Sequence, residues 1–158
     1  MTLLSKSKYM TGLQCPKYLW MVFHCPERIP KPGRAQQHIF DEGTLVGDFA
    51  KKLFPSGIDI PTDDFLGNLK KSSELLSKKK PLFEPAFTFG QLYSRADILV
   101  PVKEKWDVVE VKMSTEVKDE HIQDVAFQKY VYENFGLKIN KCFLMHINKD
   151  YVLSLIHI

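Results

Sequence analysis

Residues 106–112 read WDVVEVK, a Val-rich run preceded by the charged turn at residues 103–105. The run predicts a β-strand, in which side chains two positions apart share one face. Glu110 and Lys112 then lie side by side on the face that also carries Trp106 and Val108. A charged pair at the end of an otherwise apolar strand costs free energy unless the charges are paired or bind something. Glu110 and Lys112 are therefore the first candidates for a functional site.

A second apolar run begins at Asp97 and continues to Val100, ahead of Glu110 in the chain. A β-hairpin formed by the two runs would bring Asp97 beside Glu110. Two carboxylates at one point repel each other unless a cation lies between them. Mg²⁺ prefers oxygen ligands of this kind and retains several waters. The spacing therefore predicts a divalent-metal site on a hairpin.

Hydrophobic periodicity and turn residues place the other elements around this hairpin. We expect an α/β fold with a mixed central sheet flanked by helices. The helices are predicted at residues 37–54, 65–80 and 121–135, and further strands at residues 82–89, 93–100 and 138–147. In the last of these helices the side chains expected to face inward are Ile122, Val125, Ala126, Tyr130 and Val131.

The order Asp-x12-Glu-x-Lys on a hairpin, followed by a helix that carries glutamine, resembles the PD-(D/E)XK nuclease superfamily. The flanking residues resemble its RecB-like branch, near the CRISPR-associated exonucleases and an uncharacterised bacterial relative. The resemblance implies that Asp97, Glu110 and the main-chain carbonyl of Val111 hold Mg²⁺ or Mn²⁺. It also implies that Lys112 orients the attacking water and offsets the negative charge that develops.

The family motif also includes a glutamine that orients the lysine, the water or the substrate. Gln128 and Gln123 both match by spacing. Gln128 is preferred, because residues 124–128, DVAFQ, look most like the uncharacterised relative. A neutral amide on a partly exposed helix, with no such role, is the alternative interpretation.

The N-terminal segment Leu4-Ser-Lys-Ser, followed by Cys15-Pro-Lys-Tyr-Leu-Trp20, resembles the opening of RecB-like exonucleases. In the iron–sulfur members of that group this cysteine is the first ligand of a four-iron cluster, which thiolates commonly hold. The resemblance implies that Cys15 binds a 4Fe-4S cluster in a longer protein, whose other three ligands follow the nuclease core. A buried structural thiol is the alternative. Cys25 and Cys142 are expected to be structural.

One position departs from the family pattern. RecB-like enzymes carry a Gly-x-x-x-His helix whose histidine joins the metal site, and aligning Gly43-Thr-Leu-Val-Gly47 places Gly47 where that histidine would be. The third protein ligand is therefore open. His38, Glu42 and Asp48 are substitutes on the same predicted helix, and surface residues are the alternative interpretation.

Composition sets broad limits. The 158 residues suffice for one domain, and hydrophobic residues at 44% with charged residues at 26% are ordinary for a globular protein. A net charge of +3 permits nucleic-acid binding without requiring it. The sequence has no run of about 18 apolar residues that would predict a membrane span. Residues 1–8 lack a signal-peptide core, which favours a cytoplasmic location.

The chain is expected to divide into three parts. These are an N-terminal helical segment at residues 1–35, a nuclease-like core at residues 36–152, and a non-native tail at residues 153–158. The tail reads LSLIHI, which a widely used transposon-end sequencing adapter also encodes in one reading frame. On this hypothesis the chain is an N-terminal piece of a larger protein.

The sequence thus predicts an α/β core with an N-terminal helical segment, and the resemblance implies that this core is restriction-endonuclease-like. The resemblance implies a metal-dependent DNA nuclease, such as an exonuclease on single-stranded ends, in DNA repair or mobile-element defence. The alternative is a catalytically inactive nuclease-fold module that binds DNA or serves as a scaffold. Gly47 favours this alternative, whereas the intact Asp97, Glu110 and Lys112 argue against it. A third hypothesis is that the chain does not fold stably alone.

Overall fold

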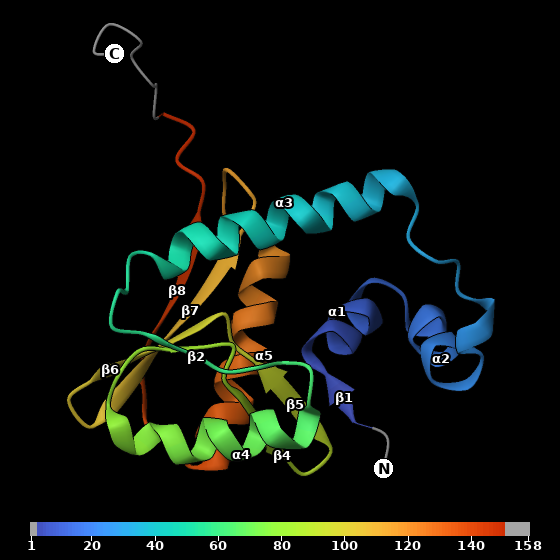
Figure 1. The fold of residues 1–158 in the computed structure, drawn as a ribbon. Helices are drawn as coiled ribbons and strands as arrows, with labels where there is room; N and C mark the ends of the chain where they lie inside the picture. Colours follow the sequence, from blue (N-terminus) through green and yellow to red (C-terminus); the bar gives the residue numbers. More distant parts are fainter. Residues whose placement is uncertain (1–2, 151–158) are drawn as a thin grey trace, which may run out of the picture.

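Two β-sheets form the centre of the molecule (Figure 1). The structure is a computed structural model and describes residues 3–150. The five-stranded sheet has the order β2-β3-β6-β7-β8, with β2 at Ile58–Asp59, β3 at Leu82–Phe83, β6 at Ile98–Val102, β7 at Lys105–Lys112 and β8 at Ile139–His146. The three-stranded sheet has the order β1-β5-β4, with β1 at Leu4–Ser5, β5 at Leu92–Arg95 and β4 at Ala86–Phe89. Both sheets mix parallel and antiparallel pairs.

Helices flank these sheets, which confirms the predicted α/β fold. The helices are α1 at Lys6–Gln14, α2 at Pro16–His24, α3 at Arg34–Lys51, α4 at Phe65–Leu75 and α5 at Asp119–Phe135. Short 3-10 helices come after α2, at Pro26–Arg28, and after α4, at Leu76–Lys78. None of the helices in residues 3–150 combines the length and apolarity needed to cross a membrane.

The predicted strands at residues 82–89 and 93–100 are each interrupted: β3 and β6 belong to the five-stranded sheet, whereas β4 and β5 belong to the three-stranded sheet. Glu84 adopts a left-handed backbone with φ of 57°, and the following Pro85 has no N–H to donate to a ladder. Ala96 donates its N–H to the carbonyl of Pro85 at 3.0 Å, and Glu84 donates to that of Asp97 at 3.1 Å. Both chain segments therefore cross together from one sheet to the other, and Asp97 lies at the crossing.

The two faces of the five-stranded sheet are covered by different helices. On one face, Val108 of β7 belongs to a buried cluster with Phe127 and Val131 of α5. On the other face, Val109 of β7 packs in a smaller cluster with Ala50 of α3. Figure 1 shows α3 crossing the strands on one side, with α5 on the other. Strand β7 is therefore enclosed between α3 and α5.

Replacing Leu99 with Ala should lower the free energy of unfolding by about 2–5 kcal/mol, because the substitution leaves a cavity in the larger core. Leu99 has no exposed surface and contacts this core from β6. The matched control is Leu66→Ala on α4, where the leucine is 72% exposed, so that its effect should stay within about 0.5 kcal/mol. Urea denaturation of both variants measures the difference, and equal losses would contradict the assigned core.

The buried face of α5 differs from the predicted one. Val125 and Val131 are buried as expected, whereas Ile122 and Tyr130 are each 53% exposed and Ala126 is exposed. Polar side chains take their places on the buried face, namely His121, Asp124 and Gln128, together with Phe127 and Tyr132. Hydrophobic periodicity could not identify this face, because three of its members are polar.

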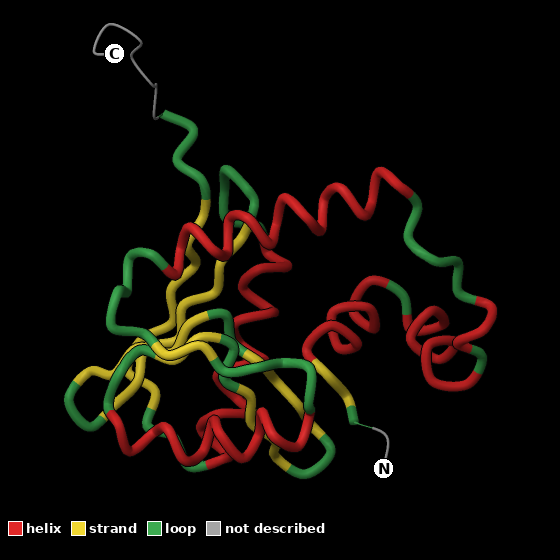
Figure 2. The backbone as a smooth tube through the Cα atoms, in the orientation of Figure 1, coloured by secondary structure: helices red, strands yellow, loops and turns green. Residues whose placement is uncertain are grey.

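The N-terminal segment joins the core through β1 and α1. Leu4 of β1 pairs with Leu92 of β5 in parallel register, and the Ser5 side chain caps α1 by accepting a hydrogen bond from the Lys8 N–H at 3.3 Å. Tyr9 of α1 stacks on Phe127 of α5 with a centroid distance of 4.7 Å. Figure 2 shows α1 and α2 standing at one side of the sheets. These contacts fix the first turn of α1 beside α5 and β5.

Candidate active site

The predicted hairpin is formed by β6 and β7. The two strands pair antiparallel with Ile98 opposite Val109, so that Asp97 and Glu110 are the next residues in register. The Asp97 carboxylate accepts a hydrogen bond from the Val111 N–H at 2.6 Å. The hairpin therefore places Asp97 beside Glu110, as the spacing predicted, and a backbone donor holds the Asp97 side chain in position.

Glu110 lies at the centre of the buried charges, with an exposed fraction of 2%. Its Oε1 accepts hydrogen bonds from Lys112 Nζ and Lys6 Nζ, each at 2.7 Å. Its Oε2 accepts one from Gln128 Nε2 at 2.6 Å. The expected Glu110–Lys112 pair is thus present, with Glu110 buried and the Lys112 side chain 23% exposed, and it lies on the inner strand β7 and not on an edge strand.

Two residues of the site were missed by sequence analysis. Asp124 accepts hydrogen bonds from Lys112 Nζ and, at 3.1 Å, from Gln128 Nε2. Lys6 reaches from the first turn of α1 and lies 3.4 Å from Asp124 Oδ1 as well as contacting Glu110. Asp124 could have been found from its position one helical turn before Gln128. Lys6 carried no comparable signal, since its partners lie more than a hundred residues away.

Gln128 faces the site and Gln123 does not. Gln128 has no exposed surface, while Gln123 is exposed and accepts a hydrogen bond from the Tyr9 hydroxyl at 3.4 Å. Carboxylates accept hydrogen bonds only, so the Gln128 amide nitrogen must face Glu110 and Asp124. Its Oε1 has no hydrogen-bond partner among the described residues. The preference for Gln128 is consistent with this placement beside Glu110 and Asp124.

We call Lys6, Asp97, Glu110, Lys112 and Asp124 the charge cluster. Burial, and for Glu110 also the neighbouring Asp97, raises the pKa of Asp97 and Glu110 above the ordinary carboxyl values. Burial alone would also raise the pKa of Asp124, but Lys6 and Lys112 lower it. Burial would lower the pKa of Lys6 and Lys112, but the carboxylates raise both. Carboxylate attraction therefore keeps both lysines charged at neutral pH.

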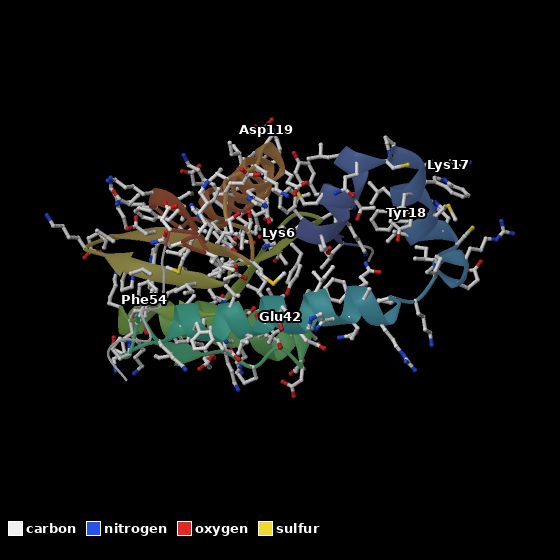
Figure 3. All side chains as sticks on the ribbon, turned by 90° about the horizontal axis from the view of Figure 1, so that it is seen from above. Lys6, Lys17, Tyr18, Glu42, Phe54 and Asp119 are labelled. Atoms are coloured by element: carbon white, nitrogen blue, oxygen red, sulfur yellow. The ribbon has the colours of Figure 1, made fainter. Side chains whose placement is uncertain are left out.

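A groove with a volume of about 860 Å³ opens onto the charge cluster. Asp97, Lys112 and Asp124 line its inner end, and α3 forms the opposite wall with Gly43 and Gly47. A Cβ atom added at either glycine would meet no atom within 4 Å. Figure 3 shows Lys6 between α3 and α5 when the molecule is viewed from above. The groove gives a large ligand direct access to Asp97 and Lys112.

The three α3 residues that could replace the missing histidine ligand, Asp48, His38 and Glu42, differ in whether they line the groove. Asp48 lines the groove, whereas His38 and Glu42 are not among its lining residues. Gly47 lines it from the same helix. Among these candidates on α3, Asp48 alone therefore faces the space in front of Asp97.

A second charged pair marks the rim of the groove. Arg95 Nε lies 3.1 Å from Glu84 Oε2, and both residues line the groove. Lys51 of α3 lies 4.0 Å from Glu84. The left-handed turn at Glu84 therefore brings its carboxylate to two cations, and the same carboxylate contributes to the raised pKa of Asp97 in the charge cluster.

The donor chemistry of the site suits Mg²⁺ or Mn²⁺. Within residues 3–150 no three His, Cys, Asp or Glu side chains gather as a metal-binding group. Mg²⁺ needs only one or two carboxylates because it retains several waters, and Asp97, Glu110 and the Val111 carbonyl are oxygen donors of that kind. Glu110 Oε1, however, already accepts from two ammonium groups.

The cysteines do not fit a four-iron cluster within this chain. Such a cluster takes four thiolates, and the chain has three cysteines. Cys15 is exposed at the corner between α1 and α2, where its Sγ accepts a hydrogen bond from the Tyr18 N–H at 3.4 Å. Cys25 and Cys142 are partly buried free thiols. The structure thus shows Cys15 as a helix cap, not as the buried thiol of the alternative interpretation.

Comparison with known proteins gives one weak similarity. No family model matches the chain. A segment of 71 residues is 31% identical to the "Uncharacterized protein UU173" of Ureaplasma parvum serovar 3. The aligned part amounts to 44% of this chain and 10% of that protein, so the chain matches a tenth of the length of this relative. The similarity assigns no family and no activity.

Proposed function

We propose that the chain carries the catalytic site of a metal-dependent deoxyribonuclease of the PD-(D/E)XK type, RecB-like branch. The observation that carries this proposal is the β6–β7 hairpin, which sets Asp97 beside Glu110 and holds Lys112 within 2.7 Å of Glu110. The groove in front of these residues supports it, because a phosphodiester chain needs open access to the reacting groups. The metal dependence and the DNA substrate in this proposal rest on the resemblance of the sequence motif to that superfamily.

In the proposed reaction, Asp97, Glu110 and the Val111 carbonyl would hold the metal. The chemistry supplied by a bound Mg²⁺ or Mn²⁺ is activation of water and stabilisation of charge on the scissile phosphate. Lys112, kept protonated by its carboxylate neighbours, orients the attacking water and offsets negative charge on the phosphate. Asp124 and Glu110 fix the Lys112 ammonium group from two sides, and the Gln128 amide nitrogen donates to both carboxylates and so holds them in place.

A catalytically inactive module that binds DNA through the same groove is the second candidate. The observation that favours it is the engagement of Glu110 by three donors, together with the missing histidine at Gly47. Such a module would bind DNA in the absence of divalent ions and leave it intact.

A cleavage assay separates these two functions. The protein is incubated with end-labelled single-stranded and double-stranded DNA in Mg²⁺, Mn²⁺ or EDTA, and binding is measured in parallel by fluorescence anisotropy. Cleavage that requires the metal supports the nuclease. Binding without cleavage in all three buffers would instead establish the binding module.

Introducing the missing histidine should strengthen metal binding. Gly47→His is expected to raise Mn²⁺ affinity by about tenfold, because Gly47 lines the groove and the space beyond its Cα is open. The control is Gly47→Ala, which adds only helix propensity worth about 0.5–1 kcal/mol. Isothermal titration with Mn²⁺ compares the two variants. Equal affinities would show that α3 is not a ligand-bearing helix.

A further inference from the structure

Lys6 is the member of the charge cluster that the proposed reaction does not use. It is the first residue of α1, directly after the Ser5 cap. Its Nζ lies 2.7 Å from Glu110 Oε1 and 3.4 Å from Asp124 Oδ1. The lysine thus contacts one carboxylate assigned to the metal and the carboxylate that positions Lys112. A surface lysine that merely anchors α1 would not need two buried partners.

The charge balance indicates what Lys6 does. The charge cluster has three carboxylates and two ammonium groups, so that its formal charge is −1 when all are ionised. A divalent cation added to the full cluster would make the total +1, in a partly buried place where unbalanced charge is unfavourable. The same cation with Lys6 withdrawn leaves the cluster neutral.

We propose that Lys6 is an internal competitor of the metal, whose ammonium group occupies Glu110 Oε1 and withdraws when a divalent cation binds there. This inference rests on the proposed metal site. Lys6 is a positioning residue in this scheme: it holds Glu110 and Asp124 in place until the metal takes over one of its contacts.

Lys112 is less able than Lys6 to withdraw from Glu110 when a metal binds. It ends strand β7, where it pairs with His146 of β8, and its short reach to Glu110 is set by their positions two apart on one strand. Lys6 reaches the cluster from a separate element. Its flexible four-carbon stem can move the ammonium group away from Glu110 without disturbing a strand.

Withdrawal of Lys6 would also loosen one attachment of the N-terminal segment. Other contacts attach α1 and the strand before it, among them the β1–β5 pairing, the Tyr9–Phe127 stack and the Tyr9–Gln123 hydrogen bond. These keep the helix in place while the lysine moves.

The test measures Mn²⁺ affinity without DNA or turnover. Lys6→Met keeps the apolar stem and removes the charge, so that it should bind Mn²⁺ at least ten times more tightly than the wild type and have a lower melting temperature in EDTA. Lys6→Arg keeps the charge and should retain wild-type affinity. The matched control is Lys8→Met on the same turn, because Lys8 contacts the Leu3 carbonyl and the Phe23 ring instead of the charge cluster.

A purely structural lysine would give a different pattern. Lys6→Met would then lose melting temperature with no gain in Mn²⁺ affinity, and this outcome overturns the inference while leaving the metal site intact. Undetectable Mn²⁺ binding by wild type and variant alike would overturn both this inference and the proposed metal site.

A second measurement uses the unaltered protein, so that it does not depend on the variants folding. Lysine acetylation followed by mass spectrometry compares each side chain in EDTA and in Mn²⁺. Lys6 should become several-fold more reactive when Mn²⁺ is bound, while Lys8 stays unchanged. Equal or lower Lys6 reactivity in Mn²⁺ would show that the lysine does not withdraw.

Discussion

Replacing Asp97 with Asn is expected to reduce Mn²⁺-dependent DNA cleavage by about 100-fold or more, because a metal ligand is lost. The fold should be retained. The side-chain oxygen of the introduced asparagine can still accept the hydrogen bond that Asp97 receives from the Val111 N–H. Removing this charge also relieves the repulsion that contributes to the raised pKa of Glu110. Stability at neutral pH should therefore equal or exceed that of the wild type, as measured by urea denaturation.

The control for this prediction is Asp107→Asn. Asp107 lies on the same hairpin and accepts hydrogen bonds from Asn140 and from the Lys141 N–H, each at 2.9 Å. It does not line the groove in front of Asp97. This variant should cleave DNA at the wild-type rate. If Asp97→Asn cleaves as well as Asp107→Asn does, Asp97 is not a metal ligand.

Loss of cleavage with retained stability would distinguish a reacting carboxylate from a structural one. Asp97 is suited to this comparison because its structural hydrogen bond survives the substitution. Glu110 is less suited, since Glu110→Gln would leave two ammonium groups with Asp124 as their remaining strong partner. Removing one partner of a buried charge pair costs about 3–5 kcal/mol, so any loss of cleavage there would mix catalysis with folding.

The hairpin and its charged residues could be predicted because their signals are local. The two-residue period of WDVVEVK determines which residues share the face of Glu110. The short turn that joins β6 to β7 predicts that the two strands pair as a hairpin. The final strand at Ile139–His146 was likewise predicted, within one residue at each end. Residue spacing was therefore enough to predict the part of the site on the β6–β7 hairpin, which carries Asp97, Glu110 and Lys112.

Other features depended on information that spacing does not carry. The break at Glu84 arises from a left-handed residue that is not glycine, which sequence patterns rarely indicate. The buried face of α5 was missed because Asp124 and Gln128 are buried by partners on β7 and α1. A polar residue becomes a core residue only when its hydrogen-bond partners arrive from elsewhere in the chain.

Lys6 is the clearest example of a site residue that the sequence could not predict, because its partners come from elsewhere in the chain. A lysine at the start of an exposed helix is ordinarily a surface residue. Its burial follows from the parallel pairing of β1 with β5, which brings the first turn of α1 beside the charge cluster. Two-residue strands such as β1 leave almost no periodic signal, so that neither the pairing nor the lysine contact could be inferred from sequence.

Raising the pH above about 10 is expected to destabilise the protein steeply. Burial raises the pKa of Tyr132 well above its ordinary value of 10.0, and the carboxylates outweigh burial in raising the pKa of Lys6 and Lys112 above 10.5. In this range the unfolded chain releases protons that the folded protein keeps. Stability therefore falls as pH rises, by up to about 1.4 kcal/mol per pH unit for each group. Urea denaturation between pH 8 and pH 11 measures this slope.

Replacing Tyr132 with Phe should reduce the loss of unfolding free energy at alkaline pH by up to about 1.4 kcal/mol per pH unit, because one buried titrating group is removed. The ring contact with Phe87, at a centroid distance of 5.3 Å, is retained. Tyr130→Phe on the same helix is the control for removal of a phenol hydroxyl, because Tyr130 is 53% exposed. The lysines account for the remaining slope, and Lys6→Met should reduce it further. Identical slopes in all three variants and the wild type would mean that neither Tyr132 nor Lys6 is held protonated by the fold.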